Sequence, residues 1–367
     1  MSIMINTMDS QMRDIVRKIE RNERLNKEDG LYLYHSSDLL TIGQLANEAN
    51  LAKNGKHVYF IENMTLYFTN VCEAKCKFCG FRRDPGEAGA YTLSPQEMID
   101  YVEKHIHPGV REFHIVGGHN HEVPFSYYVE SIRALKEKYP HVTMKSYTAA
   151  EIEFFARISN MSTEQVLRTL MDAGLSTLTG GGAEILSERY RQKMAPDKAS
   201  PQEWLSVHQT AHKLGLRTHA TMLYGSIETL EERIEHMIQL RDLQDETNGF
   251  MVFIPLAVQP LQQTAGIKRR TSAFEDIKTI AISRLMLDNF QHIKAYFINI
   301  GTQLTQMALT FGASDVHGTM LKERISHSAG ALSQEGLTRE ELVWLIKGAD
   351  RIPIERDTFY NHIKIYE

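Results

Sequence analysis

Short β-rich segments alternate with longer amphipathic segments from about residue 64 onward, and this alternation limits the 367-residue chain to an α/β fold. The β-rich segments predict strands at 65–71, 110–118, 142–149, 175–182, 216–225, 250–258 and 293–300, with a weaker one at 315–320. The amphipathic segments predict helices at 94–106, 162–174, 200–215, 229–244 and 273–290. Two of these helices begin with Ser-Pro, a capping residue followed by a first-turn proline.

Seven or eight such strand–helix units in succession predict a (β/α)8 TIM-type barrel, closed or partly open. A doubly wound open sheet is the alternative. We expect residues 1–60 to form a helical N-terminal extension, residues 61–320 the barrel, and residues 321–367 a mixed C-terminal cap that ends in a short strand. In a barrel, functional side chains gather at the C-terminal ends of the strands, so we looked for site residues there.

The three cysteines of the chain, Cys72, Cys76 and Cys79, lie within eight residues directly after the first predicted barrel strand. An odd, clustered set of this kind is not a disulfide framework and indicates a metal or redox site. The spacing Cys-x3-Cys-x2-Cys allows three thiolates on one loop to bind three irons of a 4Fe-4S cluster, which leaves the fourth iron open to a small molecule. A structural zinc ion is the alternative, but zinc normally takes four protein ligands, and the sequence has no second cysteine pair.

The composition limits the kinds of molecule that the protein is expected to bind. The net charge of −5 gives no overall basic field of the kind that attracts nucleic acid. No apolar stretch has the length of a membrane helix, and the charged N-terminal segment lacks the apolar core of a signal peptide. We therefore expect a soluble cytoplasmic protein that acts on a small molecule and binds neither nucleic acid nor membrane.

The segment CEAKCKFC, with the aromatic Phe78 before its last cysteine, resembles the signature of radical S-adenosylmethionine enzymes. The resemblance implies that S-adenosylmethionine chelates the open iron of a 4Fe-4S cluster through its amino and carboxylate groups. It implies that one electron cleaves the sulfonium to give methionine and a 5′-deoxyadenosyl radical, and that Phe78 lies against the adenine. A flavodoxin or ferredoxin-type electron donor is then expected.

Six segments distributed over the whole chain look like the aminofutalosine synthase family of the futalosine route to menaquinone. They are NVCEAKCKFCGFRRDPGEAGAY, YTAAEIEFFARI, GGGAEILSERYRQK, TMLYGSIETLEER, LQDETNGFMVFIPLA and GADRIPIERDTFY. The GGGAEI segment is shared with dehypoxanthine futalosine cyclase, whereas TMLYGSIET, LQDETNGF and RIPIERD favour the synthase. Two positions depart from the expected pattern, since Gly80 stands in place of alanine and His219 in place of asparagine.

This second resemblance implies a substrate and a reaction. The substrate is 3-[(1-carboxyvinyl)oxy]benzoate, an enol ether with two carboxylates. The deoxyadenosyl radical adds to its vinyl CH2, the aryl group migrates, and a carboxylate leaves as CO2 or bicarbonate, which gives 6-amino-6-deoxyfutalosine. The alternatives are the sister cyclase reaction, a deazaflavin-forming radical synthase, a non-catalytic iron–sulfur carrier protein, and a barrel enzyme with a structural zinc ion.

Several residues at the predicted strand ends are candidates for cofactor binding. Gly117 and Gly118 end the second strand, where the alternative is a turn that needs positive φ. Glu184 follows a run of glycines, and we expect its carboxylate to accept hydrogen bonds from ribose hydroxyls or from the methionyl ammonium. The full set assigned to cofactor binding is Phe78, Gly117, Gly118, Thr148, Glu151, Gly181 and Glu184.

A dianionic substrate calls for cations at the mouth of the barrel. Arginine is well suited to pair with carboxylates, and histidine can bind substrate or transfer a proton. The candidates are Arg82, Arg83, Arg191, His119 and His219, of which His119, His219 and Arg191 are assigned catalytic roles.

Overall fold

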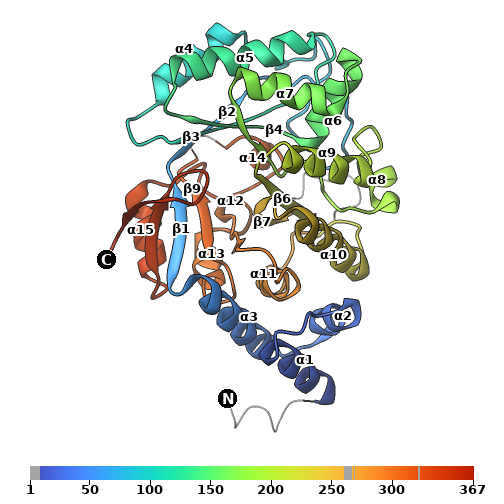
Figure 1. Ribbon diagram of the computed structural model, residues 1–367, viewed down its shortest axis with the longest axis vertical. Coiled ribbons are helices and arrows are strands. Elements are labelled where there is room, and N and C mark those ends of the chain that lie inside the picture. Colours follow the sequence, from blue (N-terminus) through green and yellow to red (C-terminus); the bar gives the residue numbers. More distant parts are fainter. Residues whose placement is uncertain (1–8, 260–266, 268, 321–322) are drawn as a thin grey trace.

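The computed structural model describes residues 9–259, 267, 269–320 and 323–367, and its centre is a barrel of parallel strands (Figure 1). Seven strands form one sheet in sequential order, and each strand pairs with its neighbours in parallel. Sequential order has no switch point, so the doubly wound alternative is wrong. The strands are β2 (Asn63–Tyr67), β3 (Glu112–Val116), β4 (Thr143–Thr148), β5 (Leu175–Thr179), β6 (Thr218–Tyr224), β7 (Phe250–Ala257) and β8 (His292–Ile293).

Strand β9 (Asp315–Gly318) lies between the last strand of this sheet and the first. It pairs with the chain after β8 through a parallel bridge between Lys294 and Asp315. Just beyond β9, the Thr319 hydroxyl accepts a hydrogen bond from the Asn63 backbone N–H at 3.1 Å. Strand β9 therefore connects β8 to the start of β2 and completes the circle.

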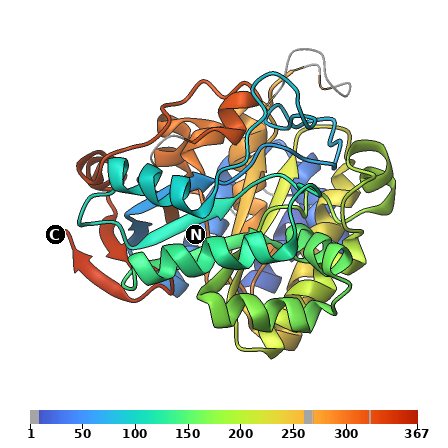
Figure 2. The same cartoon turned by 90° about the horizontal axis from the view of Figure 1, so that it is seen from above.

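Helices surround the strands when the molecule is viewed from above (Figure 2). They are α4 (Pro95–His105), α5 (Phe125–Lys138), α6 (Ala149–Ser159), α7 (Thr163–Ala173), α8 (Glu188–Met194), α9 (Pro201–Lys213), α10 (Leu230–Thr247) and α11 (Ala273–Met286). Both Ser-Pro sequences begin helices as predicted, because Ser94 and Ser200 each accept a hydrogen bond from the backbone of the third helical residue. No helix within the described part of the chain is both long and apolar enough to cross a membrane.

The strand predicted over 293–300 is wrong beyond Ile293. Residues Phe297–Ile300 form the short helix α12, and α13 (Thr302–Ala308) follows. Ala295, Phe297 and Ile298 are all buried. A short apolar run of this kind has the same appearance in a buried strand and in a buried helical turn, so its pattern does not distinguish the two.

A second, four-stranded sheet brings together segments far apart in the sequence, in the order β11-β10-β1-β9. Strand β1 (His57–Ile61) pairs in parallel with both β9 and β10, and in Figure 1 the blue β1 lies beside the orange β9. Strands from the predicted extension, barrel and cap thus share one sheet. The extension contributes α1 (Ser10–Glu20), α2 (Lys27–His35) and α3 (Leu39–Asn54), and the cap contributes α14 (Ile325–Ser328), α15 (Arg339–Lys347), β10 (Ile352–Arg356) and β11 (His362–Ile365).

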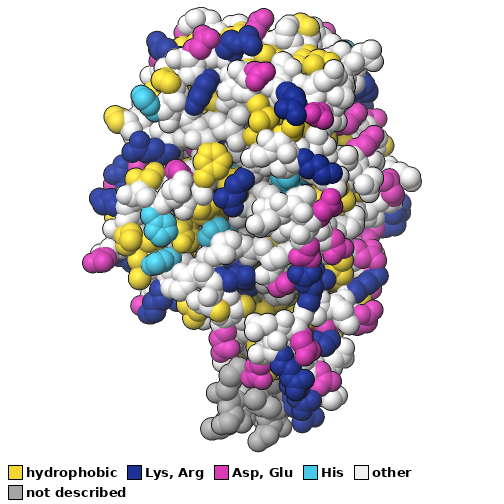
Figure 3. Space-filling view, in the orientation of Figure 1, with side chains coloured by type: hydrophobic (Ala, Val, Ile, Leu, Met, Phe, Trp, Pro, Cys, Tyr) yellow, Lys and Arg dark blue, Asp and Glu magenta, His cyan; other side chains and the backbone are white. Residues whose placement is uncertain are grey.

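The outer surface shows no concentration of one charge on the face in view. Lys and Arg side chains are interspersed with Asp and Glu side chains over this face (Figure 3). The charged side chains that are buried inside the protein are more unusual than those on its surface.

A buried ion pair joins β10 of the C-terminal cap to β9, the strand that closes the barrel. The Arg356 guanidinium donates to Asp315 Oδ2 from Nε at 3.0 Å and from Nη2 at 2.7 Å, and the Tyr360 hydroxyl donates to the same oxygen at 2.8 Å. Burial alone would raise the pKa of Asp315, but the charges of Arg356 and Lys294 outweigh it, so that the pKa is about 2. The carboxylate is therefore ionised in the folded protein.

Replacing this carboxylate tests how strongly the pair holds β9 and β10 together. We expect Asp315→Asn to lower the free energy of unfolding by about 3–5 kcal/mol at pH 7, because it leaves Arg356 buried without its counter-ion. The folded-state pKa of Asp315 lies below its ordinary value of 3.8, so its contribution is present above about pH 4 and is lost as the pH falls towards 2.

The difference between wild type and Asp315→Asn should therefore shrink between pH 4 and pH 2 in urea unfolding followed by circular dichroism. Asp350→Asn is the control, since Asp350 pairs with Lys56 at the surface and its loss should have no measurable effect. A stability for Asp315→Asn equal to that of wild type at pH 7 would contradict this account.

Candidate active site in the barrel cavity

One cavity runs from the C-terminal ends of the strands into the barrel and is lined by most of the predicted site residues. The three cysteines, Phe78 and His119 line it, and so do Arg82 and His219. Arg83 and Arg191 do not. The other predicted residues in its lining are Gly117, Gly118, Thr148, Glu151, Gly181 and Glu184.

The cysteine loop follows β2 and is attached by backbone hydrogen bonds on two sides. On one side, Glu73 N–H donates to the His119 carbonyl at 3.0 Å, and His119 N–H donates to Cys72 Sγ at 3.3 Å. On the other side, Lys77 N–H donates to the Met194 carbonyl at 2.9 Å, at the end of α8. These attachments hold the loop across the ends of the strands.

The three thiols suit a cluster better than a single ion. Burial raises the pKa of the Cys76 thiol to about 12, and it raises the pKa of Cys72 as well. Within the described ranges, no three Cys, His, Asp or Glu side chains are grouped closely enough to share one metal ion. A structural zinc site requires such convergence, whereas each iron of an iron–sulfur cluster takes its own thiolate. The donor set therefore fits an iron–sulfur cluster.

Gly117 and Gly118 are required for space and not for backbone conformation. Neither has a positive φ, so the turn interpretation is wrong at these positions. A Cβ on Gly118 would lie 2.1 Å from the Val71 carbonyl oxygen, and a Cβ on Gly117 would lie 2.7 Å from the ring of Phe68. The absence of side chains allows the end of β3 to pack directly against the cysteine loop.

The glycine segment 180–182 after β5 is fixed through all of its carbonyl oxygens. The donors are the Thr221 hydroxyl to Gly180 at 2.6 Å, the Trp204 indole to Gly181 at 3.1 Å and the Arg191 guanidinium to Gly182 at 2.9 Å. Arg191 is buried behind this segment and reaches the cavity only through it. Its contacts make it a positioning residue for the glycine segment.

Glu151 and Thr148 cap helix α6 and hold the neighbouring strand end. Glu151 accepts from the Thr148 N–H at 2.7 Å and from the Gly117 N–H at 3.2 Å, while Thr148 Oγ1 accepts from the Glu151 N–H at 3.1 Å. This capping box explains why α6 begins at Ala149, where the sequence predicted the end of a strand. Burial raises the pKa of Glu151 to about 7.

An ion pair beside the cysteines includes a residue that sequence reasoning missed. Lys198 Nζ lies 2.7 Å from Glu184 Oε1 and 5.8 Å from the centre of the Phe78 ring, and both charged side chains are largely buried. Burial would raise the pKa of Glu184, but Lys198 and Arg191 outweigh it and lower the pKa. A lysine in a loop is usually solvated, so the sequence carried no signal for this role.

The two predicted histidines are neutral at physiological pH. The ring of His119 stacks on Phe154 with centroids 5.0 Å apart, and burial lowers its pKa to about 3. Burial also lowers the pKa of His219 far below its ordinary value. His219 Nδ1 lies 3.2 Å from the Leu178 carbonyl, which only accepts, so Nδ1 carries the proton and Nε2 is a bare acceptor. Each histidine therefore offers the cavity a neutral ring and not a cation.

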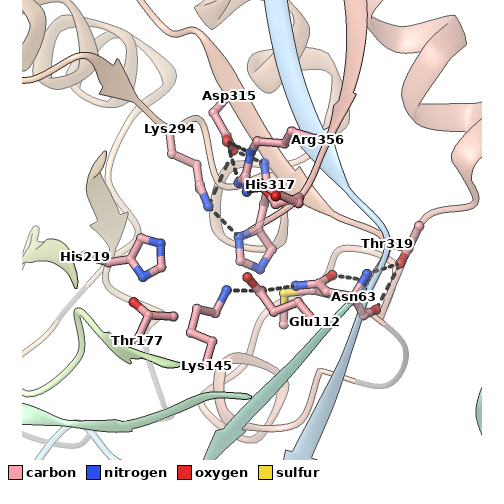
Figure 4. Close-up of polar contacts among 12 residues, drawn as sticks. Asn63, Glu112, Lys145, Thr177, His219, Lys294, Asp315, His317, Thr319 and Arg356 are labelled. Carbon is pink, nitrogen blue, oxygen red and sulfur yellow. Dashed lines mark hydrogen bonds and ion pairs between the residues drawn. The ribbon is translucent and has the colours of Figure 1, made fainter. Parts of the chain in front are cut away.

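A layer of inward-facing polar residues below the strand ends was also missed. The strand register aligns Thr65, His114, Lys145 and Thr177 across β2 to β5. Lys145 pairs with Glu112 inside the barrel (Figure 4). The alternation in β3 and β4 places these polar side chains opposite the buried Phe113 and Met144, and this was the available signal. Barrel interiors are usually filled with branched apolar residues, so a polar layer is informative.

Comparison with known proteins relates the chain to two family models. The Radical SAM superfamily model matches residues 66–240, and the CofH/MqnC C-terminal region model matches residues 247–367. Together they cover the barrel, most of the cavity lining and the C-terminal cap.

Curated relatives match along nearly the full chain. An aminodeoxyfutalosine synthase from Thermus thermophilus is 45% identical over 98% of this chain and 98% of its own length. Another from Streptomyces coelicolor is 41% identical over 97% of this chain and 95% of its own length. A cyclic dehypoxanthine futalosine synthase from Streptomyces coelicolor is 35% identical over 98% and 91%.

A solved structure has the same fold at low sequence identity. The FeFe-hydrogenase maturase HydG from Carboxydothermus hydrogenoformans superposes with a TM-score of 0.75 at 18% identity. The superposition covers 97% of this chain and 83% of that one. At this identity the similarity establishes the fold alone.

The close packing of Gly118 leads to a test of the cysteine loop. We expect Gly118→Ala to lose most of the iron and sulfide that wild type binds on anaerobic reconstitution, because the new methyl group collides with Val71 and Cys72. Gly181→Ala is the matched control, since its Cβ meets only the Thr148 methyl group at 3.0 Å. Equal iron binding by the two variants would show that the contact at Gly118 does not shape the loop.

Proposed function

Because the chain belongs to the radical S-adenosylmethionine superfamily, in the family that contains the aminodeoxyfutalosine synthases, we propose that it is a synthase of this kind. It transfers the deoxyadenosyl group of S-adenosylmethionine to 3-[(1-carboxyvinyl)oxy]benzoate and forms 6-amino-6-deoxyfutalosine in menaquinone biosynthesis. The observation that carries this proposal is a single cavity with a three-cysteine loop at its outer end and buried lysines at its inner end. The three-cysteine loop is suited to hold the cluster that generates the radical, and the buried lysines are suited to bind a substrate with two carboxylates.

We assign the cysteines to a 4Fe-4S cluster. Cys72, Cys76 and Cys79 would each bind one iron, which leaves a fourth iron for the amino and carboxylate groups of S-adenosylmethionine. When bound and reduced, such a cluster would supply the electron that cleaves S-adenosylmethionine into methionine and a 5′-deoxyadenosyl radical. Reduction requires a flavodoxin or ferredoxin-type donor, which we place with the enzyme in the cytoplasm.

The residues around the cysteines are suited to hold the rest of the cofactor. Phe78 offers a flat apolar surface for the adenine, and Glu184 offers carboxylate oxygens to ribose hydroxyls or to the methionyl ammonium. Gly117 and Gly118 allow the methionyl part to approach the backbone of β3. Thr148, Glu151 and Gly181 complete the same rim.

One side of the cavity wall, at the ends of β6 and β7, is apolar. Leu223, Ile254, Leu256 and Val258 line it, from β6, β7 and the residue after β7. Such a wall excludes water from a reactive intermediate and provides a surface for an aromatic ring. The proposed reaction forms a carbon–carbon bond from the adenosyl 5′ carbon to the vinyl CH2 and moves the aryl group to the adjacent carbon, which breaks the aryl C–O bond. One carboxylate then leaves as CO2 or bicarbonate, and the electron consumed in cleaving S-adenosylmethionine would pass back to the cluster, so the reaction is redox-neutral overall.

Product analysis tests the proposed function. The protein is reconstituted with iron and sulfide without oxygen, reduced, and given S-adenosylmethionine and 3-[(1-carboxyvinyl)oxy]benzoate, and the products are identified by mass spectrometry. We expect an adduct that contains the adenosyl group and has lost one carboxylate, together with an equal amount of methionine.

Other outcomes point elsewhere. Free 5′-deoxyadenosine with the benzoate unchanged would support radical chemistry but show that the substrate is a different one. The sister cyclase and the deazaflavin-forming synthase would then be the candidate functions. No cleavage of S-adenosylmethionine by a protein with an intact 4Fe-4S signal would contradict an enzymatic role and leave an iron–sulfur carrier.

A further inference from the structure

More buried cations than buried anions lie around the inner end of the cavity among the residues described there, and two of the cations, Lys145 and Lys294, line it. The cations are Lys145, Lys294 and Arg356, and the anions are Glu112 and Asp315. Burial lowers the pKa values of the neighbouring histidines so far that they are neutral, namely His114, His219 and His317. Burial also lowers the pKa of Lys294, to about 8, so this lysine is still mostly protonated at pH 7. One positive charge among these described residues is therefore left without a full counter-ion inside the barrel.

The uncompensated charge is on Lys294. Asp315 directs one carboxylate oxygen to Arg356, and Glu112 pairs with Lys145. Among the described residues, Lys294 Nζ has only a 3.4 Å contact to the other oxygen of Asp315 and a 3.1 Å hydrogen bond to a neutral ring nitrogen of His317 (Figure 4). Its side chain is 1% exposed, so solvent does not supply the missing interaction.

His317 places an N–H donor without an acceptor next to the Lys294 ammonium, among the described residues. An ammonium only donates, so His317 Nδ1 must accept the bond from Lys294, and the ring proton must be on Nε2. That Nε2 is buried and has no hydrogen-bond partner among the described residues. His317 also has φ +77°, a left-handed conformation that is costly for a residue with a side chain. The chain thus places a strained histidine beside the cavity with an unpaired N–H.

Two further buried polar atoms in the same layer have no partner among the described residues. They are Thr65 Oγ1 and His114 Nδ1. Thr65 pairs in register with His114, which in turn pairs with Lys145, so these atoms lie around one level of the barrel. Unpaired buried polar groups are rare in native proteins and require an explanation. A polar ligand at this level would satisfy them together.

We propose that Lys294, His317 and Lys145 form a subsite that binds the benzoate carboxylate of the substrate. The subsite rests on the proposed function, and it adds the three residues that recognise one end of the substrate. An anion there supplies the counter-ion that Lys294 lacks and an acceptor for His317 Nε2. Leaving a buried charge uncompensated is costly, so a bound carboxylate stabilises this arrangement.

The position of the subsite determines which carboxylate it binds. Lys145 precedes Thr148, at the end of β4, by three residues, which places it about 10 Å below the rim of the cavity. The vinyl CH2 must lie near the rim to meet the adenosyl radical. The enol ether then extends inward along the apolar wall, so its benzoate carboxylate is the group that reaches Lys294.

Binding without turnover provides the test. The reconstituted holoenzyme, with its cluster unreduced and S-adenosylmethionine present, is titrated calorimetrically with the substrate and with the analogue that has a benzamide in place of the benzoate. We expect wild type to bind the carboxylate at least about 10-fold more tightly than the amide. In Lys294→Met this ratio should fall to about 1, because the charge-assisted bond is gone.

A second variant and a control make the result decisive. His317→Phe retains the ring that packs on Tyr296 but removes the N–H, and it should lower the ratio as well, so it carries the test if Lys294→Met does not fold. Lys278→Met is the matched control, since that ammonium binds the Tyr34 and Ser36 carbonyls outside the cavity and should leave the ratio unchanged.

The outcomes separate the subsite from the proposed function. A wild-type ratio near 1, or an unchanged ratio in folded Lys294→Met, would overturn the subsite even if the adenosyl adduct is formed. A ratio that depends on Lys294, with no adduct from the reduced enzyme, would support the carboxylate subsite and contradict the synthase reaction.

Discussion

The buried carboxylate of Asp315 is the point on which the rest of the structure depends. It pairs with Arg356 from the C-terminal sheet, accepts from the Tyr360 hydroxyl, and lies near Lys294 inside the barrel. Its other oxygen accepts from the His317 backbone N–H at 2.7 Å, which holds the strained end of β9. One group thus fixes the closure of the barrel, the attachment of the second sheet and the shape of the cavity floor. Since Arg356 neutralises Asp315, Lys294 remains available to a ligand.

The two ends of the cavity are built by different physical means. At the rim, backbone hydrogen bonds and side-chain-free glycines such as Gly118 bring the cysteine loop close to the strand ends. At the floor, charges are buried and left partly unpaired, which a protein tolerates when a ligand completes them. Apolar side chains from β6 and β7 line one side of the cavity. This arrangement matches a substrate whose reacting carbon and whose aromatic carboxylate are at opposite ends of the molecule.

The sequence was most informative where the determining contacts are local. The strand–helix alternation predicted the barrel, and the spacing of Cys72, Cys76 and Cys79 predicted a loop that lines the cavity. His119 was identified by its position at a strand end, whereas His219, near the start of β6, was identified because it departs from the family pattern, and both line the same cavity. Their charge state was not predictable, because it depends on burial by side chains from other elements.

The buried charged residues at the inner end of the cavity were not predicted, for the same physical reason. A lysine in a sequence is ordinarily expected to be solvent-exposed, and only the closed barrel buries Lys145 and Lys294. Pairing between β1 and the C-terminal β10 likewise depends on contacts across almost the entire chain. Burial and long-range pairing are properties of the folded chain, so they became visible only in the structure.

In the proposed reaction the adenosyl carbon becomes bonded to the substrate within this cavity. The most direct measurement uses S-adenosylmethionine labelled with ¹³C at the 5′ carbon and the enol ether labelled with ¹³C at its vinyl CH2, with the product examined by NMR. The account predicts a one-bond ¹³C–¹³C coupling between the two labels in a product that has lost one carboxylate. Labelled 5′-deoxyadenosine, with its methyl carbon bonded to no substrate carbon, would contradict it.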